Sequence, residues 1–100
     1  MNSKVAGVTF ENRQEVVALL TEGEVLTAVR EPDNAFDSRA IALRRADGTQ
    51  VGYINSKLAW NLSTVMDVGI PLHVVVTEVT GRMEGRSLGA NIRIEQLDLE

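Results

Sequence analysis

A chain of 100 residues has room for one domain with a modest hydrophobic core, and its 44% hydrophobic and 24% charged residues are typical of a folded rather than a disordered protein. The absence of cysteine excludes disulfides and thiolate metal sites, and no apolar run reaches the roughly 20 residues of a membrane-spanning helix. The net charge of −4 argues against indiscriminate nucleic-acid binding. From the length and the lack of cysteine we expect a cytoplasmic single domain over residues 1–100, with its core at about 4–97.

Short β-branched runs alternate with two helical patterns in the order β-α-β-β-β-α-β-β. Asn12 with Glu15 matches a capping box at the start of the first helix, Gly23 is placed to end that helix, and Ser56 is placed to cap the second. The strands are expected at 5–10, 24–30, 40–45, 50–54, 72–80 and 88–97, with a polar connection at 81–85.

Turn signals between the strands indicate how the sheet is built. Asp47-Gly48 is a strong hairpin signal, and Gly52 within the following strand predicts a close backbone approach or a bulge. The fold class is therefore mainly β with two helices (α+β), a six-stranded OB-like, partly open β-barrel. A ferredoxin-like sandwich is the competing architecture.

Side chains that commonly carry catalysis are scarce. His73 is the only histidine, and no HExxH, GxSxG or phosphate-loop sequence occurs. We therefore expect no enzyme, no metal site and no cofactor. Between Arg30 and Arg93, eight basic residues stand against seven acidic ones, so any anion-binding surface must be local.

The four aromatic residues are more informative. Phe10, Phe36 and Tyr53 each stand outside the middle of a long apolar run, so core packing and ligand contact are both open for them. Trp60 is offset from the apolar stripe of the second helix, and we expect it to pack between the helix and the sheet.

Four segments together resemble a HIRAN domain: VAGVTF, then REPDNAFDSRAIAL, then DGTQVGYINSKLA, then GANIRI. The resemblance runs from about Lys4 to Ile94, and its most specific piece is Arg-Glu-Pro-Asp-Asn-x-aromatic-Asp. It implies a six-stranded OB-like barrel. HIRAN domains occur fused to Swi/Snf-type DNA translocases and as small bacterial proteins. The best-understood ones grip the 3′ end of single-stranded DNA.

The resemblance also implies which residues would meet a DNA end. Phe36 takes the position of a loop aromatic that stacks on a terminal base, and Asp37 that of an acid that accepts a hydrogen bond from the 3′-hydroxyl. Further stacking or phosphate contacts are expected from Phe10, Tyr53, Ser56, Lys57, Arg30 and Arg39.

This sequence departs from the family pattern at three positions. Phe36 lacks the hydroxyl of a commoner Tyr, Thr9 replaces an arginine that can contact phosphate, and Arg39 replaces a common Asn that could order the loop. We therefore expect weak, salt-sensitive binding to single-stranded DNA ends. The resemblance implies a role in DNA repair or replication-fork processing, with a helicase, translocase or other protein as partner. The alternative is a protein-interaction or scaffold domain that has lost the DNA-end site.

Overall fold

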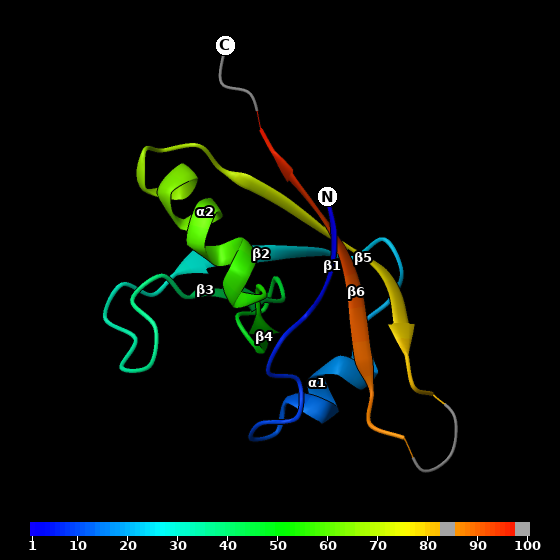
Figure 1. Cartoon of the computed structure of the whole chain (residues 1–100). Helices are drawn as coiled ribbons and strands as arrows, with labels where there is room; N and C mark the ends of the chain where they lie inside the picture. Colours follow the sequence, from blue (N-terminus) through cyan, green and yellow to red (C-terminus); the bar gives the residue numbers. More distant parts are fainter. Residues whose placement is uncertain (83–85, 98–100) are drawn as a thin grey trace.

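The computed structural model describes residues 1–82 and 86–97; the predicted connection at 81–85 lies partly outside them (Figure 1). Within this part of the chain, two helices and six strands follow one another in the predicted order. They are β1 (Asn2–Lys4), α1 (Arg13–Leu19), β2 (Val25–Arg30), β3 (Ile41–Arg44), β4 (Gln50–Tyr53), α2 (Ser56–Asp67), β5 (Leu72–Thr80) and β6 (Gly89–Gln96).

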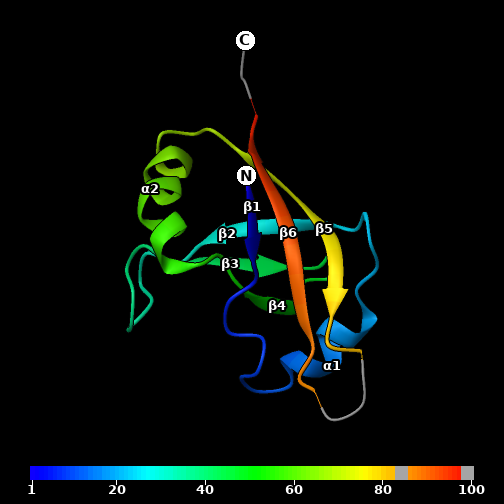
Figure 2. The same cartoon turned by 45° about the vertical axis from the view of Figure 1, so that its right-hand side comes forward.

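The six strands form one antiparallel sheet in the order β1-β6-β5-β2-β3-β4. Figure 2 shows β5 and β6 running across β2, β3 and β4, so that the sheet curls strongly. The two ends of the sheet meet just after β1, where Ala6 and Tyr53 exchange both backbone hydrogen bonds at 2.8 Å. The predicted OB-like, partly open barrel is confirmed, and the ferredoxin-like sandwich is wrong.

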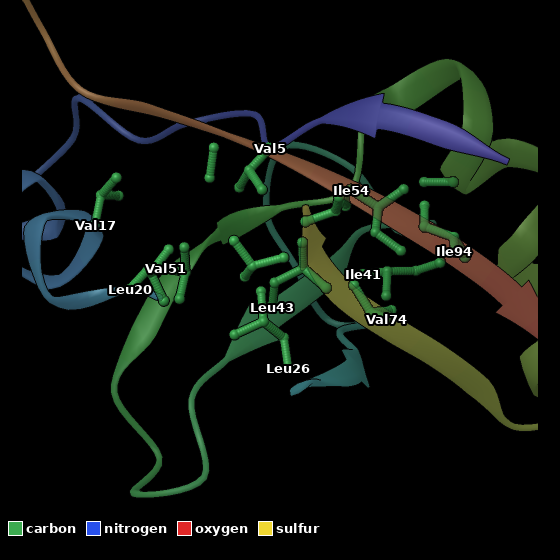
Figure 3. Close-up of a cluster of buried hydrophobic side chains, with 14 of the residues drawn as sticks. Val5, Val17, Leu20, Leu26, Ile41, Leu43, Val51, Ile54, Val74 and Ile94 are labelled. Atoms are coloured by element: carbon green, nitrogen blue, oxygen red, sulfur yellow. The ribbon is translucent and has the colours of Figure 1, made fainter. Parts of the chain in front are cut away.

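The core fills the inside of the curl (Figure 3). Ile41 and Leu43 point inward, as the alternation of β3 predicts, and both are fully buried. Val17 of α1 and Leu20, which directly follows that helix, add to the core, and α1 packs beside β4. Apolar side chains from β2, β4, β5, β6 and α2 complete the cluster, which includes Leu26, Val51, Leu62, Val74, Ile92 and Ile94.

The predicted first strand at 5–10 is wrong in its position. The strand is Asn2–Lys4, which pairs with β6. After the bridge at Ala6 the chain turns, because Gly7 takes a φ of +72° that suits glycine and breaks the extended run. Phe10 consequently lies in the turn before α1 rather than at the end of a strand.

Both helix starts also differ from the prediction. Asn12 precedes α1 with φ −94° and ψ 20°, outside the extended region of a capping residue, and its side chain accepts no capping hydrogen bond. Asn55, not Ser56, caps α2, where its side chain accepts the backbone N–H of Lys57 at 2.8 Å. Gly23 does not end α1: that helix stops at Leu19, and the Gly23 N–H donates to Val76 of β5.

Gly52 makes the predicted close approach. A Cβ at this position would overlap the carbonyl oxygen of Ala6 and lie 2.7 Å from Cγ1 of Val5. The glycine therefore lets β4 reach the segment after β1 and close the barrel. Among the described residues, neither helix has the length and apolarity to cross a membrane.

Candidate functional site

A groove of about 680 Å³ opens beside the closure of the barrel. Its walls come from three segments: the turn at 6–13, the β2–β3 loop at 34–40, and the junction of β4 with α2 at 53–56. In both overall views the β2–β3 loop lies below α2 (Figures 1 and 2). The groove brings together five of the eight residues expected at a DNA site, Phe10, Phe36, Asp37, Tyr53 and Ser56.

Asn34 orders the loop that carries the central pair. Its Oδ1 accepts the backbone N–H groups of Phe36 at 2.9 Å and Asp37 at 3.1 Å, an Asx-type turn. Its Nδ2 donates to Oε1 of Glu31 at 3.0 Å, which ties the turn to the end of β2. The loop is therefore fixed although Arg39 replaces the residue that the family pattern places there.

Phe36 projects into solvent and is 98% exposed. Burying a phenylalanine side chain would be worth about 1.5–3 kcal/mol, so the fold gives up this contribution on a loop that it otherwise holds in place. Phe10, which is 66% exposed, faces the same groove. Of the two uses left open by the sequence, core packing does not apply to either ring.

Asp37 lies beside the exposed Phe36 ring and is half-buried. Its Oδ1 accepts the backbone N–H of Arg39 at 2.9 Å. Its second oxygen, Oδ2, accepts no hydrogen bond from residues 1–82 or 86–97. The carboxylate thus keeps one oxygen available in a groove that is lined by aromatic rings.

Tyr53 is held as a wall of the groove rather than projecting into it. Its hydroxyl donates to Oε1 of Glu31 at 2.8 Å, and the guanidinium of Arg13 lies 5.2 Å from its ring centroid. Arg13 in turn donates from Nη1 to the carbonyl oxygen of Gly7 at 2.9 Å. One face of the Tyr53 ring is therefore already occupied by a cation.

Glu31 joins this wall to the loop. Burial acts to raise the pKa of its carboxyl, but hydrogen bonds from Asn34 and Tyr53, with the charges of Arg44 and Arg13, together lower that pKa below its ordinary value. The carboxylate is thus the common acceptor that sets the position of the tyrosine ring and of the Asn34 turn.

The three remaining expected residues lie outside the groove lining. Arg30 donates to both carboxylate oxygens of Asp67 and to the carbonyl oxygens of Ser38 and Ala40, so it braces the base of the loop. The hydrogen bond from Arg30 lowers the pKa of Asp67. Lys57 is exposed on the first turn of α2.

Arg39 reaches over α2, where its guanidinium lies 4.1 Å from the ring centroid of Trp60. The expectation that Trp60 packs between helix and sheet is wrong, because the residue is 63% exposed on the outer side of α2.

Two contributors to the groove were missed from sequence. Arg13 arrives from α1 only because the chain turns at Gly7, and no local pattern signals that placement. Asn34 did carry a signal: it sits in the turn sequence Pro-Asp-Asn, where an Asn side chain commonly bonds the backbone that follows it. Among residues 1–82 and 86–97, no group of three acidic or histidine side chains is placed to hold a metal ion.

Comparison with known proteins agrees with this architecture. The family model described as HIRAN domain matches residues 1–95. The helicase-like transcription factor of Oryctolagus cuniculus is 37% identical over 49 residues, 49% of this chain but only 5% of that protein.

Two solved structures share the fold. The crystal structure of the HIRAN domain of human HLTF has a TM-score of 0.71 at 22% identity, over 94% of this chain and 73% of that one. A protein from Lactobacillus plantarum has a TM-score of 0.74 at 23% identity, over 94% and 91% of the two chains. With the family model covering nearly every residue and the curled six-stranded sheet in place, the chain belongs to the HIRAN domain family.

Proposed function

We propose that this HIRAN domain is a non-catalytic module that binds single-stranded DNA by its 3′ end. The observation that carries the proposal is the pairing of an almost fully exposed Phe36 ring with the half-buried carboxylate of Asp37 in one groove. The family resemblance assigns stacking and hydroxyl recognition to these two positions.

Stacking would supply most of the affinity. A base that stacks on an aromatic side chain gains about 1–3 kcal/mol whatever its identity, so binding is expected to tolerate any sequence. Phe36 and Phe10 offer exposed rings on the same groove, while Tyr53 and Arg13, which lies over the Tyr53 ring, form part of its wall. Arg13 also places a positive charge in the lining, where it partly makes up for the arginine that Thr9 replaces.

The acidic side chains of the groove would select the end of a strand. Glu11 and Asp37 both line it, and their charges repel the phosphates of a continuous strand. A 3′-hydroxyl carries no charge and can donate a hydrogen bond to the available oxygen of Asp37. The phosphates that precede this terminus would leave the groove towards the basic side chains of Arg39 and Lys57.

The proposal is tested by comparing oligonucleotides that end in a 3′-hydroxyl or a 3′-phosphate. Like charges about 4 Å apart repel by about 1 kcal/mol in water and about 4 kcal/mol at a protein surface, so the hydroxyl end should bind at least roughly fivefold more tightly. Asp37→Asn can still accept the Arg39 N–H through its amide oxygen, which keeps the loop in place. The variant should strongly reduce the preference, chiefly by improving binding of the phosphorylated end, while Glu11 keeps part of the repulsion.

Equal binding of the two ends by the wild-type protein would refute end recognition. Absence of binding to either oligonucleotide at low salt would instead favour a protein-interaction domain. Because the chain spans only a small part of the helicase-like transcription factor that it matches, a place in DNA repair or fork processing, beside a translocase, is part of this proposal.

A further inference from the structure

Trp60 presents an aromatic surface that the groove does not include. The residue is 63% exposed on α2, and the Arg39 guanidinium covers one region of its ring at 4.1 Å. Nη1 of Arg39 is held there by the carbonyl oxygen of Trp60 at 3.2 Å and by the hydroxyl groups of Ser63 at 3.3 Å and Thr64 at 3.1 Å. We call this pair the Trp60–Arg39 platform.

The platform continues the groove along α2. Ser56 lines the groove, and Trp60 follows it by four residues, so the two side chains are neighbours on one stripe of the helix. The loop provides a second connection, because the backbone N–H of Arg39 donates to the Asp37 carboxylate. A ligand that leaves the groove past Asp37 and Ser56 therefore meets the platform next.

The chemistry of the platform suits a nucleotide. The indole offers a stacking surface, and the guanidinium beside it is a favourable partner for a phosphate. Lys57 adds an exposed positive charge on the same part of α2. Asp67, at the C-terminal end of α2, forms an ion pair with Arg30 at 2.9 Å. Its carboxylate therefore repels a phosphate less than an unpaired carboxylate would.

We propose that the Trp60–Arg39 platform binds a nucleotide upstream of the two at the 3′ end, with its base on the exposed indole and its phosphate near Arg39. This inference rests on the proposed function of the groove. It lengthens the site from a pocket for one end into a track for a short single strand. The occupant is single-stranded nucleic acid rather than protein, because the surface is basic and continuous with the groove.

The single tryptophan of the chain provides a direct reporter. Oligothymidylates of about two and about eight nucleotides, each with a free 3′-hydroxyl, would be titrated while Trp60 emission is followed. The longer strand should quench the emission and bind roughly 5- to 150-fold more tightly than the shorter one. The shorter strand should leave the emission largely unchanged.

Variants separate this inference from the function of the groove. Trp60→Ala should remove the advantage of the longer strand but keep the preference for a 3′-hydroxyl over a 3′-phosphate. Trp60→Phe keeps an aromatic ring and should keep most of the advantage of the longer strand. This result would show that the effect of Trp60→Ala comes from the lost ring and not from unfolding. Val68→Ala changes another exposed apolar residue, 70% exposed just after α2, and should alter neither property.

Three outcomes would count against the platform. Emission that the longer strand leaves unchanged, or full affinity of Trp60→Ala for that strand with the hydroxyl preference intact, would overturn the inference alone and assign the exposed ring to another partner. Failure of the wild-type protein to bind either strand would overturn the proposed function, and the platform with it.

Discussion

Replacing Phe36 by alanine should separate binding from stability. The side chain is 98% exposed, so its removal should change the free energy of unfolding by less than about 0.5 kcal/mol. The loop should keep its shape, because Asn34 Oδ1 accepts the backbone N–H groups of residues 36 and 37. An alanine at position 36 has the same backbone N–H. The loss of one stacked base should cost about 1–3 kcal/mol of binding, or roughly 5- to 150-fold in Kd.

The assay is fluorescence anisotropy of a labelled oligothymidylate with a free 3′-hydroxyl, beside urea denaturation of each variant. Leu19→Ala is the matched control, because Leu19 is also a large exposed apolar residue, 63% exposed on α1, and does not line the groove. The control should bind like the wild type. Unchanged affinity of Phe36→Ala would refute the stacking role, and a loss of stability above about 1 kcal/mol would refute the outward placement of the ring.

Two further predictions concern the frame of the groove. The pKa of Glu31 is lowered in the folded state, so the stabilising contribution of its carboxylate is present above the ordinary value of 4.5 and is lost as the pH falls through the folded-state pKa. The free energy of unfolding of the wild type should therefore fall relative to that of Glu31→Gln only below about pH 4.5. A difference between the two proteins that stays constant between pH 3 and 7 would contradict this. Gly52→Ala should destabilise the fold by about 1–3 kcal/mol and speed amide exchange at Ala6 and Tyr53, because the added Cβ meets the Ala6 carbonyl; native exchange rates there would show that the closure does not need glycine.

Local patterns were sufficient for most of the fold. The alternation of Ile41 and Leu43 identified β3, and β5 runs from Leu72 to Thr80 as its β-branched sequence predicts. The first strand was misplaced because Asn2–Lys4 is a strand only through its pairing with β6, nearly 90 residues away, and the apolar run after it is interrupted by the turn at Gly7. Pairing at such a distance leaves no local signature.

The candidate site also combines features that local sequence predicts with features that depend on contacts between distant residues. The turn that carries Phe36 could be predicted from the Pro-Asp-Asn sequence, but core packing and ligand contact were both open for its ring, and only the structure shows that the ring is exposed. The roles of the arginines depend on distant partners: Arg30 meets Asp67, Arg13 meets Tyr53, and Arg39 meets Trp60. Trp60 lies off the apolar stripe of α2, and this offset indicates an exposed residue rather than one packed against the sheet.

The most direct test is a titration of isotopically labelled protein with a short oligothymidylate that carries a free 3′-hydroxyl, followed by NMR at low salt. Binding in the groove predicts that the amide signals of residues 7–13, 34–40 and 53–56 shift together and saturate with one dissociation constant. Signals that stay in place, or that shift only on the far surface of β5 and β6, would contradict the assignment of the groove as the DNA-end site.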